Sequence, residues 1–235
     1  MATYVLVHGA WHTGAELEPT AAPIRAAGHD VHTPTIAGNR PGDAKTVGLS
    51  EAIKSIVDYL AQKNLKDVVL VGHSYGGSVI TEAGNDPNVA ALVYIAAFAL
   101  DEGESCASIE TAVPQASKAF KPDSDGNWWI EQDHFAADFA ADIPAEQAAF
   151  MAIAQVPIST DAFTHKVSNP AWKNKPTWYM VAGSDLSINP IQERMMAKRA
   201  NATTVEVNSS HVAYMSHPKE AAKLIEDAAT HAHVN

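Results

Sequence analysis

Residues 68–80 decide the fold, and their sequence is Val68-Val69-Leu70-Val71-Gly72-His73-Ser74-Tyr75-Gly76-Gly77-Ser78-Val79-Ile80. Four aliphatic residues that end at Gly72 are typical of a short strand buried on both faces. Beyond the Gly-x-Ser-x-Gly pattern, apolar residues from Val79 to Ala83 recur at helical spacing. Ser74 is therefore predicted to lie on a sharp turn from strand to helix, near the N–H groups that open the helix.

Two glycines flank this serine, and they keep side chains out of a turn that forces the nucleophile's backbone into a strained conformation. The plain alternative is a serine in a glycine-rich turn with no chemical role. Strand, turn and helix in this order favour an exposed nucleophilic hydroxyl at the carboxyl end of a strand.

The bulk composition predicts one soluble globular domain over residues 1–235, because 46% of the residues are hydrophobic and 18% are charged. The net charge of −11, from 16 basic and 27 acidic residues, argues against nucleic acid or an anionic membrane as partner. Both of those partners require a basic surface. The expected partner is a small-molecule ester, and a homodimer is left open.

Single features exclude several other classes. Cys106 is the only cysteine, so neither an intrachain disulfide nor a cysteine-based zinc cluster can form. Residues 1–7 lack the basic region of a signal peptide and are expected to form a strand. No apolar stretch reaches membrane-spanning length, so we expect a cytoplasmic protein. No metal or cofactor motif occurs, and no cofactor is expected.

Strand-like and helix-like segments alternate through the first half of the chain, which predicts a parallel sheet with helical crossovers. A helix is expected after Ser50 as its N-cap, and a loop over residues 35–48. The expected strands of this half are residues 4–7, 30–33, 68–71 and 91–95.

The alternation stops between about residues 101 and 171, which predicts an insertion folded over the carboxyl edge of the sheet. It is rich in aromatic residues that could line a pocket or hold the insertion together. The alternation then resumes with strands expected at residues 177–181 and 203–207 and helices at 190–199 and 218–229.

A serine nucleophile needs an imidazole base, and the base needs a carboxylate that orients it. Asp185 and His211 each follow a predicted strand, so both should lie at the sheet edge where Ser74 lies. Serine, acid and histidine in this order are typical of the α/β-hydrolases. Asp101, which follows the strand at residues 91–95, is a rival for the acid.

Other histidines compete as the base, but no predicted strand end fixes them at the same edge. His217 opens the last predicted helix, where a structural role is expected. The remaining candidates are His29, His32, His134, His165, His231 and His233.

Two backbone N–H groups are needed for the oxyanion of the tetrahedral intermediate. One is expected from Tyr75, the residue after the nucleophile, and the other from Ala10 in the loop after the first strand. Gly9 should let that loop approach the substrate closely. His8 and His73 are expected to be hydrogen-bonded scaffold.

With these residues assembled, the chain resembles the small bacterial α/β-hydrolases related to plant methyl-ester esterases and hydroxynitrile lyases. The shared motifs are His8-Gly9-Ala10-Trp11-His12, Gly72-His73-Ser74-Tyr75-Gly76-Gly77 and the segment from Asp185 to Pro218. The resemblance implies a six-stranded, mostly parallel sheet flanked by helices, with a mainly helical cap. It also favours Asp185 over Asp101.

Two positions distinguish the branches that this resemblance implies. The lyase branch typically has Thr after the first motif's histidine and Lys after the catalytic histidine, where this chain has Gly9 and Val212. A departing cyanide would therefore lack its cation, which favours the esterase branch. The family often has an aromatic pair where this chain has Ala15 and Glu16, a difference expected to alter the shape of the pocket entrance.

The sequence thus predicts a Ser74–His211–Asp185 serine hydrolase that cleaves carboxylic esters of small or medium apolar substrates through an acyl-enzyme. A hydroxynitrile lyase using the same three residues and a non-catalytic small-ligand binder are the alternatives. The residues expected to line the substrate pocket are Gly9, Trp11, Trp128, Phe135, Phe163 and Val212.

Overall fold

The computed structural model of the chain describes residues 1–43 and 45–232. Its strands and helices alternate along much of the chain. In chain order they are β1 (Thr3–Val7), η1 (Gly14–Leu17), α1 (Glu18–Ala26), β2 (Asp30–His32), α2 (Leu49–Gln62), β3 (Val68–Ser74), α3 (Tyr75–Ala83), β4 (Val89–Ala97), α4 (Cys106–Ala112), β5 (Phe120–Pro122), β6 (Trp128–Ile130), α5 (Gln132–Asp138), α6 (Ala145–Ile153), α7 (Thr160–Thr164), η2 (Ala171–Lys173), β7 (Thr177–Ala182), α8 (Pro190–Arg199), β8 (Thr203–Val207), α9 (Ala213–Ser216) and α10 (Pro218–His231).

Six strands form one sheet in the order β2-β1-β3-β4-β7-β8, and every pairing in it is parallel. The predicted six-stranded parallel sheet is thereby confirmed. β3 lies in the middle and is buried along its whole length, as its uninterrupted aliphatic run predicts. Because parallel strands end at one edge, the residues that follow β1, β3, β7 and β8 gather there.

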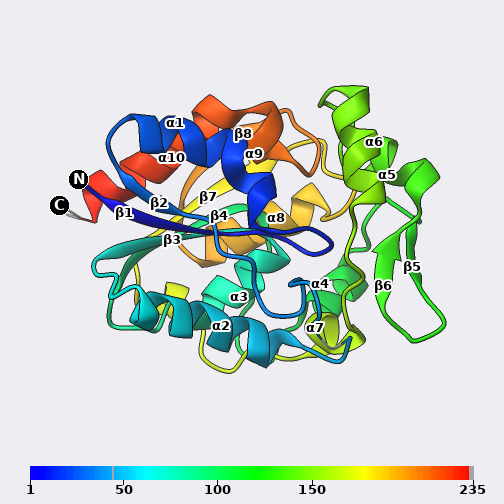
Figure 1. Cartoon of the computed structure of the whole chain (residues 1–235), viewed down its shortest axis with the longest axis horizontal. Helices are drawn as coiled ribbons and strands as arrows, with labels where there is room; N and C mark the ends of the chain where they lie inside the picture. Colours follow the sequence, from blue (N-terminus) through cyan, green and yellow to red (C-terminus); the bar gives the residue numbers. More distant parts are fainter. Residues whose placement is uncertain (44, 233–235) are drawn as a thin grey trace.

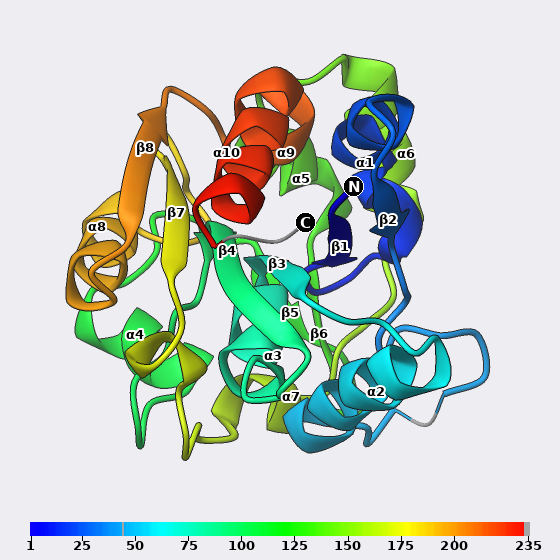
Figure 2. The ribbon, with the colours of Figure 1, turned by 90° about the vertical axis from the view of Figure 1, so that its left-hand side faces the viewer.

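Helices cover both faces of the sheet (Figures 1 and 2). α1 and α10 pack against each other on one face, and α2 and α3 pack against each other on the opposite face. β2 and β3 lie on opposite sides of β1, so right-handed β-α-β connections place α1 and α2 on opposite faces of the sheet. The core therefore has three layers, with the sheet in the middle.

The segment from residue 101 to 171 interrupts the strand–helix alternation, and it contains α4, the antiparallel β5–β6 hairpin, α5, α6 and α7. In Figure 1 the hairpin, α5 and α6 lie beyond the carboxyl ends of the sheet strands. A main-chain hydrogen bond joins the segment to the loop after β1, in which Val156 N–H donates to Trp11 O at 2.6 Å. The carboxylate of Asp142, in the same segment, accepts hydrogen bonds from Ser210 in the loop after β8.

The expectation that Ser50 caps the second helix is wrong. α2 begins at Leu49 with Gly48 as its N-cap. The carboxylate of Glu51 accepts a hydrogen bond from Gly48 N–H at 3.0 Å, so the third helical residue supplies the cap instead. A side chain at position 48 would collide with the Asp161 carboxylate, which explains the glycine.

Candidate active site

Ser74 lies at the junction of β3 and α3 with φ 54° and ψ −125°, a left-handed conformation that is rare for a residue with a side chain. The surrounding chain leaves no room for larger residues. A Cβ at Gly72 would lie 2.7 Å from Gly76 O, and one at Gly76 would lie 2.5 Å from His8 O. The two glycines therefore allow the sharp turn that presents the Ser74 hydroxyl at the sheet edge.

A hydrogen-bonded chain links Ser74, His211 and Asp185. The Ser74 hydroxyl donates to His211 Nε2 at 2.7 Å, and His211 Nδ1–H donates to Asp185 Oδ2 at 2.5 Å. The imidazole and carboxylate side chains have no solvent exposure. An imidazole so placed can take a proton from the hydroxyl while the buried carboxylate stabilises the imidazolium that results.

Asp185 is held by the loop that follows β7. Its Oδ1 accepts hydrogen bonds from Ser187 N–H at 2.7 Å and Ile188 N–H at 3.1 Å. Glu193 on α8 is fully buried behind it and accepts from Ala182 N–H. Burial, and then the charge of Asp185, raise the pKa of Glu193 well above its usual range. The raised pKa favours the protonated form of Glu193 beside Asp185.

The loop that carries His211 is fixed from two sides. Asp142, from the segment between β4 and β7, accepts hydrogen bonds from the Ser210 hydroxyl and, at 3.0 Å, from Ser210 N–H. On the other side, His73 Nε2–H donates to His211 O at 2.9 Å. The ring of Phe139 packs on the imidazole with ring centroids 4.8 Å apart. These contacts restrict the imidazole to one orientation.

The two N–H groups expected to hold an oxyanion belong to buried residues, Ala10 and Tyr75. Neither group donates to another backbone carbonyl within the described residues. The loop after β1 comes very close to the serine, since a Cβ at Gly9 would lie 2.9 Å from Ser74 Cβ and 3.0 Å from His73 Nδ1. Gly9 thus permits the close contact between this loop and Ser74, and its approach to a substrate stays a prediction.

The histidines expected to be scaffold are hydrogen-bonded within the core. His8 Nδ1–H donates to Gly9 O at 2.7 Å, and His8 Nε2 accepts from Ile36 N–H at 3.1 Å. Burial lowers the pKa of His8 to about 4, so the ring is neutral. Burial also lowers the pKa of His73 well below its usual value.

Glu16 forms a buried polar cluster beneath the same loop. Its Oε1 accepts from Gly9 N–H at 3.4 Å, its Oε2 lies 3.3 Å from His12 Nδ1, and His73 Nδ1 lies 3.9 Å from Oε1. The Glu16 side chain is only 6% exposed, and burial raises its pKa to about 8. The cluster therefore holds a neutral carboxyl next to neutral imidazoles.

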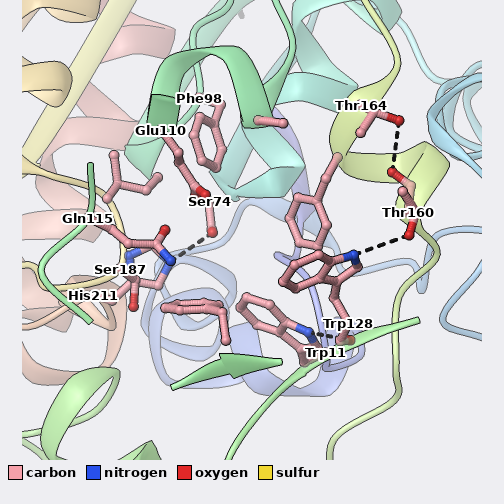
Figure 3. A pocket seen from close by; sticks show the side chains of 14 residues that line it. Trp11, Ser74, Phe98, Glu110, Gln115, Trp128, Thr160, Thr164, Ser187 and His211 are labelled. Atoms are coloured by element: carbon pink, nitrogen blue, oxygen red, sulfur yellow. Dashed lines mark hydrogen bonds between the residues drawn. The ribbon is translucent and has the colours of Figure 1, made fainter. Parts of the chain in front are cut away.

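Ser74 and His211 open into a cavity of about 140 Å³ (Figure 3). An apolar cavity of about 150 Å³ is known to take up benzene, so the chamber suits a group of about one aromatic ring. Its apolar wall consists of Trp11, Phe98, Phe120, Trp128, Phe163 and Ile188.

Of the residues predicted to line the substrate pocket, three border this cavity (Trp11, Trp128 and Phe163) and three do not (Gly9, Phe135 and Val212). Phe135 is fully buried against His12 and Phe139, so it holds the segment together rather than facing a ligand. Gly9 and Val212 are buried.

Several lining residues were not foreseen. Phe98 follows β4 and Ser187 follows Asp185, so both lie just past strand ends, and that position could have indicated them. Three more lie in the segment from residue 101 to 171, namely Glu110, Gln115 and Phe120. That segment has no regular strand–helix alternation from which their place at the sheet edge could be predicted.

The rival residues lie elsewhere. Asp101 forms a salt bridge with Lys173 at 2.6 Å and is partly exposed. His29, His32, His217 and His231 have local hydrogen-bond partners, and His134 lies on the exposed part of α5. His165 lies 3.8 Å from Asp161, and His233 is outside the described residues.

Residues 1–43 and 45–232 contain no group of three His, Cys, Asp or Glu side chains placed to hold a metal ion. In the same part of the chain, every helix is too short or too polar to cross a membrane.

A sequence model described as "Alpha/beta hydrolase family" matches residues 4–224. The chain is 40% identical over 127 residues to a carbendazim hydrolyzing esterase of Nocardioides sp. (strain SG-4G); this match spans 51% of the chain and 52%, about half, of that esterase. It is 27% identical over 246 residues to a pyrethroid hydrolase of Sphingobium wenxiniae, covering 96% of the chain and 86% of that protein. A methylesterase from Arabidopsis shares the fold, with a TM-score of 0.81 at 19% identity over 98% of the chain and all of the methylesterase (100%).

Proposed function

The chain belongs to the alpha/beta hydrolase family, and on this basis we propose that it is a serine hydrolase that cleaves carboxylic esters of small or medium apolar substrates. The observation that carries the proposal is the buried hydrogen-bonded chain from Ser74 through His211 to Asp185, which opens into the cavity. Relatives named as an esterase and a pyrethroid hydrolase support the same reaction class.

In the proposed reaction, Ser74 Oγ attacks the ester carbonyl while His211 Nε2 accepts the hydroxyl proton. Asp185 stabilises the imidazolium. The N–H groups of Ala10 and Tyr75 hold the negative oxygen of the tetrahedral intermediate. The imidazolium then protonates the departing alkoxide, and the acyl group stays on the serine.

A water molecule completes the cycle. His211 removes a proton from the water, the resulting hydroxide attacks the acyl carbonyl, and Ser74 leaves as its hydroxyl. The carboxylic acid is released. Each proton transfer uses the same nitrogen, which the short contact between His211 Nε2 and the Ser74 hydroxyl already favours.

The cavity favours apolar groups of limited size. Its volume of about 140 Å³ accepts about one ring, so larger parts of a substrate must extend out of the cavity. The rings of Trp11 and Phe163, with centroids 5.9 Å apart, give flat apolar surfaces on which such a group can pack.

A fluorophosphonate probe and a panel of p-nitrophenyl esters with graded acyl length test the proposal. We expect covalent labelling at Ser74, labelling lost in Ser74→Ala, and turnover that falls as the acyl chain outgrows the cavity. A chain that neither reacts with the probe nor hydrolyses any ester would be a ligand binder instead. Turnover of mandelonitrile without turnover of p-nitrophenyl acetate would assign a lyase.

A further inference from the structure

One ionisable side chain of the cavity has no part in the proposed reaction. Glu110 on α4 lines the same cavity as Ser74 and His211. Figure 3 shows its side chain entering from α4 toward the side of the cavity on which Ser74 and His211 lie, whereas Trp11 and Trp128 form the other side. The neighbouring wall is mostly aromatic or aliphatic, so the carboxyl is a polar spot in an apolar surface.

A second side chain holds this carboxyl in place. The amide nitrogen of Gln115, in the orientation that faces acceptors, lies 2.9 Å from each carboxyl oxygen of Glu110 and 3.2 Å from Ser187 O, so its two N–H groups are shared among these acceptors. Ser187 belongs to the loop that holds Asp185. The orientation of the Glu110 carboxyl is thereby tied to the loop that carries Asp185.

The charge state of Glu110 does not come from an ion pair. Within the described residues no lysine, arginine or histidine forms a salt bridge with it. Burial, and then the charge of Asp185, raise its pKa to about 8. Keeping a carboxyl in such a wall is costly unless it is hydrogen-bonded, and perturbed carboxyls in clefts are frequently functional.

The place of Glu110 along the cavity also matters. A second cleft of about 370 Å³ shares Ala107, Glu110, Gln115 and Phe120 with the cavity. Glu110 and Gln115 therefore lie where the enclosed chamber meets the outer cleft. The middle part of a substrate that fills both the cavity and the second cleft would therefore lie next to the Glu110 carboxyl.

We propose that Glu110, oriented by Gln115, is a specificity-determining residue that accepts a hydrogen bond from an N–H group of the substrate. The substrate class is then an aromatic ester or carbamate that carries an amide, carbamate or heterocyclic N–H next to its ring. This inference rests on the proposed ester hydrolysis. A carboxyl oxygen accepts such a bond in both protonation states, while Gln115 occupies one acceptor site on each oxygen.

Two pairs of matched esters test it, because the ring could lie on either side of the scissile bond. Methyl indole-2-carboxylate and methyl benzofuran-2-carboxylate differ by N–H against O in the acyl part. Indol-5-yl acetate and benzofuran-5-yl acetate differ in the same way in the leaving group. The readout is the ratio of kcat/KM within one pair for one variant, so a general loss of activity cancels.

For the wild-type enzyme we expect a preference of about ten- to a hundredfold for the N–H member of at least one pair. Glu110→Leu should reduce that ratio to about one, because no acceptor remains. Glu110→Gln should keep much of it, because the amide carbonyl still accepts. Circular dichroism and labelling of Ser74 by the fluorophosphonate probe verify that each variant folds.

Turnover of p-nitrophenyl acetate separates the two possible failures. If the wild-type enzyme hydrolyses it but shows no N–H preference, no turnover of either pair, or a preference that Glu110→Leu leaves intact, the assignment of Glu110 is wrong. If neither p-nitrophenyl acetate nor the probe reacts, the proposed function itself is wrong.

Discussion

The buried carboxyl of Glu16 should make the stability of the protein depend on pH. Glu16 lies under the loop after β1, next to His12 and His73, and burial raises its pKa from 4.5 to about 8. A group that binds its proton more tightly in the folded state destabilises that state as pH rises from the unfolded pKa to the folded one. Glu16→Gln removes this titration and keeps a neutral side chain of the same shape.

The size of the effect follows from the pKa shift. One pKa unit corresponds to about 1.4 kcal/mol, so the full shift of Glu16 amounts to about 5 kcal/mol. About 3 kcal/mol of this develops between pH 4.5 and pH 7, and this is an upper value. The difference in unfolding free energy between Glu16→Gln and wild type should therefore grow in favour of the variant over this range.

Urea unfolding followed by circular dichroism at pH 5 and pH 7 measures that difference. Glu146→Gln, on the exposed part of α6, is the matched control and should shift stability by a similar small amount at both pH values. Histidines that do not contact Glu16 contribute equally to both proteins, so their contribution cancels in the comparison. A variant that becomes relatively less stable at pH 7 would refute the reasoning, because Glu16 would then be ionised and paired with a protonated histidine.

Three further changes test the site and its support. Asp185→Asn should lower kcat for p-nitrophenyl acetate by about 10⁴-fold, as loss of the orienting carboxylate does in serine hydrolases. Asp101→Asn should lower kcat in the same assay less than twofold. A larger loss for Asp101→Asn than for Asp185→Asn would move the acid to the loop after β4. Gly9→Ala should lower kcat/KM at least about tenfold in the same assay, because its Cβ would press on Ser74; unchanged kinetics would show that the loop is free to move. Arg199→Ala should lower the free energy of unfolding by about 2 kcal/mol in urea titrations, since it removes a partly buried pair with Glu104; a loss below about 0.5 kcal/mol would mean that water replaces the pair.

Strand ends account for most of what could be predicted from the sequence. Ser74, Asp185 and His211 each lie at or just past the end of a short strand-like run, and parallel strands bring such positions to one edge. Local pattern, together with the serine–acid–histidine order and the family resemblance, therefore indicated residues that are 137 and 26 positions apart in the chain.

Other features depend on contacts that local pattern does not encode. Glu110 and Phe120 reach the cavity only through the path of the segment between β4 and β7, which has no regular period. Phe135 has the same aromatic character as Trp128, and only packing decides that one is core and the other faces the cavity. At α2, the preference of Ser50 for an N-cap was outweighed by the Glu51 carboxylate reaching back to Gly48.

The order of the three hydrogen-bonded residues along the chain has a consequence for synthesis. The nucleophile ends the third strand of the chain, whereas the imidazole follows β8, the last strand of the chain. During synthesis residue 74 is therefore made 137 residues before the imidazole that would activate it. Reaction with a serine-directed reagent would thus report on finished, fully assembled molecules and leave incomplete ones unmarked.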